Sequence, residues 1–227
     1  MIKTPMLMKV ESMVKDILSQ DKTGHGFDHI QRVLDLSMSF AKGQPIDEEL
    51  VSLVALLHDV DDYKFVGIEH ATLYKNARSI MRTCGVHDSL QTKVISNIQR
   101  IGYSRCIEGI RPITLEGQIV SDADMCDAIG ATGLIRVTTY GLAKGQPYFL
   151  PNVFPQPNHD ADAYRKNGSN HTINHFFDKL LKIKNLMMTE LGKKEAIARH
   201  QFLINFLEQF FKEEKADAWL QLLDQFR

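Results

Sequence analysis

The segment DEELVSLVALLHDV (residues 47–60) decides the fold. Asp47 is a residue type that commonly precedes the first turn of a helix, and the residues after it are dense in leucine and valine. Apolar side chains cover every side of this helix, which predicts that it is fully buried. The segment runs directly into ionisable residues, among them His58, Asp59 and Asp62. Buried carboxylates are costly unless they are paired or coordinate a metal, so the end of this helix is a candidate functional site.

Helical spacing of apolar residues continues on both sides of this segment. Gly43 and Gly85 stand where the neighbouring helices would end. Few stretches alternate as a strand would, so the expected fold class is all-α. The predicted helices are 6–20, 27–42, 69–84, 88–101, 115–129, 171–191, 193–212 and 216–226.

The stretch from Gly141 to Ser169 differs from the rest because it is rich in proline, asparagine and glycine. This composition predicts an irregular segment, and a long loop in a compact domain is often functional, for example as a lid. We expect a single domain over residues 1–227, with an irregular, lid-like insertion at 141–170 and C-terminal helices at 171–227.

The overall composition limits the classes of partner. Lys and Arg number 27 against 28 Asp and Glu, so there is no basic excess that would indicate a nucleic acid polymer or a membrane surface as partner. The 3 cysteines have no paired spacing, which argues against a disulfide framework or a CxxC zinc site. With no signal peptide and no long apolar run, a cytoplasmic protein is expected.

Histidines and carboxylates gather at the ends of three predicted helices. His29 lies at the start of one helix, His58 and Asp59 follow the buried helix, and Asp124 lies in the run IVSDADMCD. Two imidazoles and two carboxylates form a ligand set that suits Mn, Fe, Co, Ni or Zn better than Ca. Spacing alone does not distinguish such a site from His and Asp side chains scattered over a helical protein.

Four segments together resemble a subgroup of small bacterial HD-domain hydrolases. They are FDHIQRVLDL (27–36), ALLHDVDDYKF (55–65), IVSDADMCDAIGATGLIR (119–136) and the long run from His175 to Phe210. The resemblance covers most of the chain apart from the first twenty residues and the proline-rich loop. It implies an HD-domain-like helical bundle.

The resemblance also implies a ligand set, because metal ligands in this superfamily follow the order H…HD…D. Here the upstream His is His29, the doublet is His58 and Asp59, and the downstream Asp is Asp124. They are expected to hold one divalent ion (Mn, Fe, Co, Ni, Zn or Mg). One departure is Gly26, which stands where the subgroup often has Asp, so a polar contact is expected to be missing there.

Further roles are implied for acidic and basic residues. Asp62 is expected to position or deprotonate the attacking water, or to protonate the leaving oxygen; the alternative is an exposed carboxylate at a helix end. Lys64, Arg105 and Lys179 are expected to neutralise substrate phosphate, with Arg105 as a binding contact; the alternative is solvated surface cations.

The remaining candidates are histidines and aspartates close to the ligands in sequence. His25 and His175 are expected to contact the substrate, and Asp122 and Asp127 to hold the imidazoles in one orientation by hydrogen bonds. The spacing of His171 and His175 would also suit a second metal ion, but one ion is the favoured prediction.

Together these residues predict a metal-dependent phosphohydrolase that acts on a small phosphorylated molecule. The resemblance points to a nucleotide pyrophosphohydrolase or phosphatase, working by attack of a metal-bound hydroxide on phosphorus. Two alternatives stay open: a cyclic-nucleotide phosphodiesterase, and a regulatory module that binds metal and ligand but turns over poorly. A purely structural helical protein would not explain the metal-type residues. The sequence leaves homo-oligomerisation open.

Overall fold

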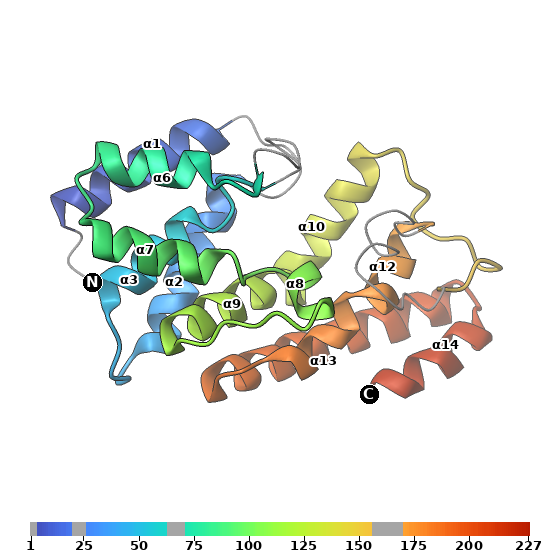
Figure 1. Cartoon of the computed structure of the whole chain (residues 1–227). Helices are drawn as coiled ribbons and strands as arrows, with labels where there is room; N and C mark the ends of the chain where they lie inside the picture. Colours follow the sequence, from blue (N-terminus) through green and yellow to red (C-terminus); the bar gives the residue numbers. More distant parts are fainter. Residues whose placement is uncertain (1–3, 20–25, 63–70, 156–169) are drawn as a thin grey trace.

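The computed structural model describes residues 4–19, 26–62, 71–155 and 170–227, and within these ranges the chain is helical and contains no strand (Figure 1). The predicted all-α fold class is therefore confirmed. The elements are α1 (Pro5–Leu18), α2 (Phe27–Ala41), α3 (Glu48–Leu57), α6 (Lys75–Thr83), α7 (Asp88–Ile98), α8 (Tyr103–Ile107), α9 (Leu115–Asp127), α10 (Gly130–Ala143), α12 (Thr172–Asp178), the 3₁₀ segment η1 (Leu180–Leu186), α13 (Glu190–Glu213), α14 (Asp217–Leu223) and the 3₁₀ turn η2 (Asp224–Phe226).

The α3 helix forms the centre of the N-terminal half. The Asp47 carboxylate accepts hydrogen bonds from the backbone N–H groups of Glu49 (3.0 Å) and Leu50 (3.1 Å), so it caps the first turn as predicted. Every residue from Leu50 to Leu57 is buried, which confirms the burial expected from the sequence. The helices α1, α2, α7 and α9 pack against α3. This packing holds the residues that follow Leu57 in a fixed place.

The α9 helix connects the two halves of the molecule. It packs on α2 and α3 on one side and on α10 and α13 on the other. In Figure 1, α9 accordingly lies between the group formed by α1, α2, α3, α6 and α7 and the group formed by α10, α12, α13 and α14. It also buries polar side chains, including Asp122 and Asp127. A buried helix with several carboxylates needs specific partners for each of them.

The helix predicted over 171–191 is wrong, because the chain breaks at Lys179, whose backbone angles are φ −136° and ψ −60°. The segment continues as η1, and Met187 is extended before α13 begins. The interruption between η1 and α13 has its physical reason in α9: the Asp122 carboxylate accepts hydrogen bonds from the N–H groups of Met188 (3.0 Å) and Thr189 (2.7 Å). These donors are therefore not available to a continuous helix.

The irregular segment is also shorter at its start than the sequence indicates. The α10 helix, which the sequence patterns do not reveal, extends to Ala143, so the irregular part of the described chain covers 144–155. The short α8 helix is a second element that the patterns miss. Residues 156–169, the remainder of the expected lid-like insertion, lie outside the described residues.

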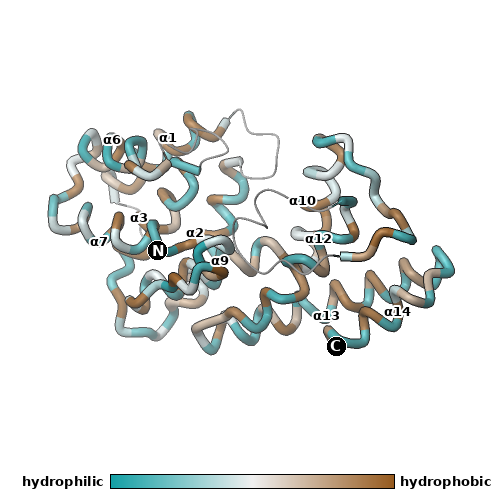
Figure 2. Tube along the Cα trace, turned by 45° about the vertical axis from the view of Figure 1, so that its right-hand side comes forward, coloured by the Kyte–Doolittle hydropathy of each residue, from teal (hydrophilic) through white to brown (hydrophobic). Residues whose placement is uncertain are grey.

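The C-terminal half is assembled around aromatic side chains. Figure 2 shows apolar and polar positions alternating along α13 and α14, as amphipathic helices require. Trp219 of α14 is buried, stacks on Phe211 (ring centroids 5.5 Å apart) and lies 5.3 Å from the Phe149 ring. Its indole N–H donates to the carbonyl of Pro151 (2.8 Å), which ties the irregular segment to α14. No helix in the described ranges has both the length and the apolar character needed to cross a bilayer.

The buried His200 of α13 predicts a pH dependence of stability. Its Nε2 donates to the Phe226 carbonyl (2.7 Å), and its Nδ1 is buried with no hydrogen-bond partner in the described part of the chain. Burial lowers the pKa of His200, because protonation would place an N–H at Nδ1 with nothing to accept it. The unfolded chain therefore takes up this proton first as the pH falls.

We expect the free energy of unfolding to decrease as the pH falls below about 6.5, with His200 contributing at most about 1.4 kcal/mol per pH unit. Urea unfolding of the wild-type protein and of His200→Gln between pH 8 and pH 5 measures this. The variant should lose part of the slope below pH 6.5. Identical slopes in the two proteins would contradict the prediction.

Candidate metal centre

Four side chains from three helices converge where α3 ends. His29 lies in the first turn of α2, His58 and Asp59 directly follow α3, and Asp124 lies in the last half of α9. The Nε2 atoms of His29 and His58 are 3.3 Å apart. His29 Nε2 lies 3.4 Å from an Asp59 oxygen and 3.5 Å from an Asp124 oxygen. For His58 Nε2 the corresponding distances are 3.8 and 3.7 Å.

These distances match a shared cation. Ligand atoms bonded at about 2.1 Å to a tetrahedral ion lie about 3.4 Å apart, and neighbouring ligands of an octahedral ion lie about 3.0 Å apart. The His29 and His58 side chains are 1% exposed, whereas Asp59 and Asp124 are 18% and 22% exposed. The imidazoles thus form the buried side of the cluster, and its carboxylate side is open to a substrate.

The hydrogen bonds of the two imidazoles support the same interpretation. His29 Nδ1 donates to Asp127 Oδ2 (2.7 Å), and His58 Nδ1 donates to the Ala55 carbonyl (2.8 Å). Both acceptors lack a proton to give, so each Nδ1 carries the hydrogen and each neutral ring presents its Nε2 lone pair. Two facing lone pairs beside two carboxylates repel one another unless a cation lies among them. The donor set therefore fits a divalent metal ion.

The electrostatics of the cluster show this excess of negative charge. Burial lowers the pKa of His58, but the neighbouring Asp59 and Asp124 carboxylates outweigh it and raise that pKa to about 9. Burial raises the pKa of Asp124, and hydrogen bonding to His58 together with the charges of the two imidazoles brings it below its ordinary value. A proton on His58 thus takes the place that a metal ion would fill.

Asp127 is the residue that orients His29. Besides His29 Nδ1, its carboxylate accepts hydrogen bonds from Arg32 Nε (2.7 Å) and Arg136 Nη1 (2.7 Å). Burial raises the pKa of Asp127, but the hydrogen bonds from His29 and Arg32 and the charge of Arg136 hold it well below the ordinary range. The carboxylate is therefore ionised and keeps the His29 ring in one orientation.

Sequence patterns did not single out the two arginines. Arg32 lies three residues after His29 on the same helix, and it also donates to Asp28 (2.7 Å). Arg136 ends the third of the segments that resemble the HD-domain subgroup, but it reaches Asp127 from a helix the sequence did not reveal. The requirement that a buried carboxylate has a cationic partner is the one signal that could have indicated them.

The expectation that Asp122 also orients an imidazole is wrong. Its carboxylate accepts hydrogen bonds from the N–H groups of Met188 and Thr189 and from the Thr189 hydroxyl group. Both residues directly precede α13. Successive residues of a helix turn by about 100°, so Asp122 and Asp124 point to nearly opposite faces of α9. Asp122 therefore fastens α13 to α9, and Asp127 has the role expected of both.

The other predicted residues lie after α3, on α8, on or just after α12, or outside the described residues. Asp62 follows α3 in a turn rather than a helix, and its N–H donates to the Asp59 carbonyl (3.1 Å). Lys179, just after α12, places its ammonium group 5.2 Å from the ring of Tyr103 in α8, the helix that also carries Arg105. His175 lies one turn before Lys179 in α12. His25 and Lys64 lie outside the described residues.

The chain is similar to several known proteins. A family model for the HD domain matches residues 26–129. A solved protein from Lactobacillus plantarum is 32% identical, with 95% of this chain and 100% of that chain covered and a TM-score of 0.83. An HD-superfamily hydrolase from Bacillus thuringiensis is 32% identical (92% and 97% covered, TM-score 0.70). YpgQ from Bacillus subtilis, solved in complex with ADP, is 26% identical (91% and 97% covered, TM-score 0.65).

The chain belongs to the HD superfamily. HD domains bind divalent metals, and His29, His58 and Asp59 each offer a ligand atom within 4.8 Å of the others.

The centre predicts how substitutions change metal content. His58→Ala and Asp59→Ala should each abolish stoichiometric binding of a divalent ion, because each removes a ligand atom. Asp127→Asn should weaken binding by about 10–100-fold, since it loses the charge that orients His29. Elemental analysis after dialysis against a metal buffer measures the number of metal ions bound per chain. His87→Ala, a substitution of an exposed histidine, is the control. Full occupancy in His58→Ala and Asp59→Ala would overturn the assignment.

Proposed function

We propose that this protein is a metal-dependent phosphohydrolase whose substrate is a small phosphorylated molecule, specifically a nucleotide. The observation that carries the proposal is the convergence of two oriented imidazoles and two partly exposed carboxylates on one point. Its open carboxylate side leaves room for a phosphate oxygen. The complex of the related YpgQ with ADP supports a nucleotide as the substrate.

His29, His58, Asp59 and Asp124 would hold the ion. When bound, a divalent ion lowers the pKa of a coordinated water and neutralises charge on phosphate oxygens. The two aspartates offset the charge of the ion, so the phosphate groups of the substrate need further cations. Arg105 and Lys179 are the candidates for this role within the described residues, because α8 brings them into the same region. Lys64 and His25 stay predictions.

The chemical step is hydrolysis of a phosphoanhydride or phosphoester bond. The oxygen of the attacking water forms a bond to phosphorus, and the bond from phosphorus to the bridging oxygen breaks with its electron pair on that oxygen. One proton leaves the water, and one proton is needed by the leaving oxygen. Asp62, three residues after Asp59, is the proposed proton-transfer group: it either accepts the proton of the attacking water or delivers the proton to the leaving oxygen.

A nucleotide panel tests the proposed function. The protein, purified without chelator and supplied with Mn²⁺, should release pyrophosphate or phosphate from nucleoside triphosphates, with about one metal ion bound per chain. Scoring the two products separately identifies the bond that is cleaved. Stoichiometric metal without turnover of any nucleotide would contradict the nucleotidase proposal and favour a binding module.

Asp62→Asn tests the proton-transfer role. Turnover should fall by about 100-fold or more while the bound metal stays unchanged, because general acid–base catalysis contributes about 10²–10⁴-fold. Asp35→Asn is the matched control, since Asp35 is an exposed carboxylate on α2. If Asp62→Asn keeps the wild-type turnover number, Asp62 has no part in proton transfer.

A further inference from the structure

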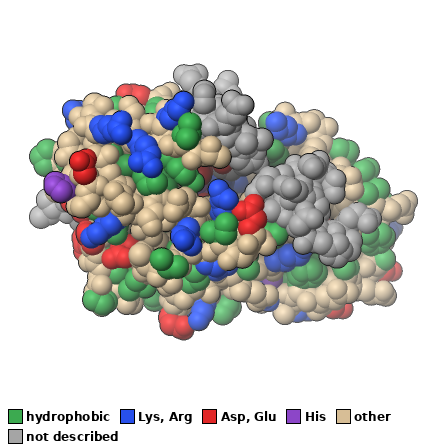
Figure 3. All heavy atoms as spheres, in the orientation of Figure 1, with side chains coloured by type: hydrophobic (Ala, Val, Ile, Leu, Met, Phe, Trp, Pro, Cys, Tyr) green, Lys and Arg blue, Asp and Glu red, His purple; other side chains and the backbone are tan. Residues whose placement is uncertain are grey.

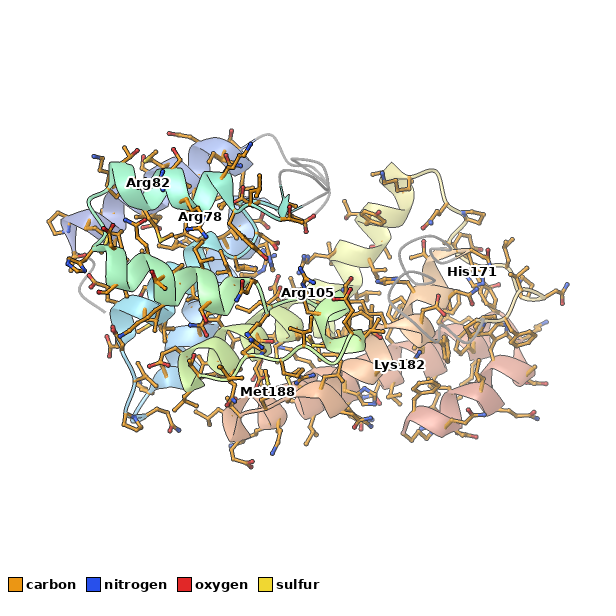
Figure 4. All side chains as sticks on the ribbon, in the orientation of Figure 1. Arg78, Arg82, Arg105, His171, Lys182 and Met188 are labelled. Atoms are coloured by element: carbon orange, nitrogen blue, oxygen red, sulfur yellow. The ribbon has the colours of Figure 1, made fainter. Side chains whose placement is uncertain are left out.

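A pocket of about 350 Å³ lies where the start of α6, the end of α7 and α8 meet. It is lined by Thr72, Tyr74, Gln99, Arg100, Arg105 and Ile110. Two of these residues are arginines, and none of these described lining residues is acidic. Figure 4 shows Arg105 on α8 in the middle of the molecule, with Arg78 and Arg82 farther along α6. The lining therefore combines positive charge with hydroxyl and amide groups.

Within the described part of the chain, the hydrogen bonds of the two arginines use only some of their guanidinium donors. The Nε of Arg100 is buried and has no partner in the described part of the chain, and its Nη1 makes one long contact with the Arg111 carbonyl (3.5 Å). Arg105 pairs through one nitrogen with Glu108 (3.0 Å), and its side chain is 38% exposed. Because Glu108 balances one of the two guanidinium charges, Arg100, Arg105 and Glu108 together retain a net positive charge.

The wall formed by Tyr74 has an unusual backbone. Tyr74 has φ 49° and ψ 44°, the left-handed region that bulky side chains seldom adopt. The turn is held by Asp61, whose carboxylate accepts hydrogen bonds from Asn76 N–H and Ala77 N–H (both 2.9 Å), and by Asn76, which donates to the Val60 carbonyl (2.9 Å). Backbone strain of this kind persists where the surroundings enforce it, and it is concentrated at functional sites.

One wall of the pocket is held by a residue that is close in sequence to a metal ligand. Asp61, which holds the Tyr74 wall, is two residues from the metal ligand Asp59. Lys179 also reaches α8 through the ring of Tyr103. The start of α6, which forms one wall of the pocket, is thus hydrogen-bonded to a residue two positions from a metal ligand.

We propose that this pocket is a second anion-binding subsite, which receives the phosphate groups of the substrate that are not at the metal centre. The identity of the ligand rests on the proposed function. Guanidinium groups pair with phosphate oxygens through two parallel hydrogen bonds, and hydroxyl and amide groups add neutral donors.

Binding of inorganic tripolyphosphate to the full chain, after treatment with a chelator, tests the pocket without any turnover. Arg100→Gln and Arg105→Gln should each weaken the affinity by about tenfold or more, as expected for loss of a charge-assisted contact. Figure 3 shows Lys and Arg side chains spread over this face of the molecule, so a matched control is needed. Arg78→Gln, on α6 and outside the lining, should change the affinity less than twofold. Circular dichroism checks that each variant is folded.

Equal affinity in the wild type and both pocket variants would overturn the proposal, as would an equal loss in Arg78→Gln or no binding to the wild type at millimolar concentration. These outcomes do not depend on hydrolysis, so they are distinguishable from failure of the proposed function.

Turnover of nucleoside mono-, di- and triphosphates by Arg105→Gln gives the second measurement. The loss in kcat/KM should grow with the number of phosphate groups. An equal loss for all three substrates would contradict the proposal, because it would mean that the pocket does not bind the phosphate chain.

Discussion

The hydrogen bond from His29 to the buried carboxylate of Asp127 is the interaction on which the centre depends. It turns the lone pair of His29 toward His58, 3.3 Å away, and so creates the point where a cation is favourable. The carboxylate can be buried only because Arg32 and Arg136 pair with it, and these come from α2 and α10. The same contact therefore fixes the position of three helices and the orientation of one ligand.

The ligands are precise because they stand on buried helices. The α3 helix has no exposed residue from Leu50 onward, so His58 and Asp59 follow a rigid support. The α9 helix presents Asp124 and Asp127 toward the metal centre and Asp122 toward α13. One helix thus serves the site with one face and assembles the C-terminal half with the other.

The charges of the centre explain why cations are needed beyond it. Asp59 and Asp124 would together offset one divalent ion, and Arg32 and Arg136 are offset by Asp127 and Asp28, so the centre has no positive charge left for a phosphate chain. The arginines of the pocket beside α8, and Lys179 against Tyr103, are the cations proposed to supply this charge. This division separates the groups that hold the ion from those proposed to hold the rest of the substrate.

The amino-acid sequence by itself determined the helical class and the burial of residues 50–57, because apolar periodicity is a local property. The order of candidate ligands came from the resemblance of four segments to HD-domain hydrolases. Only the tertiary structure decided which carboxylate serves which partner. His29 and Asp127 are 98 residues apart, and Met188 meets Asp122 across 66 residues. The interruption between η1 and α13 has the same origin. Each depends on contacts between helices, and the spacing of residues within one helix carries no information about the helix that packs beside it.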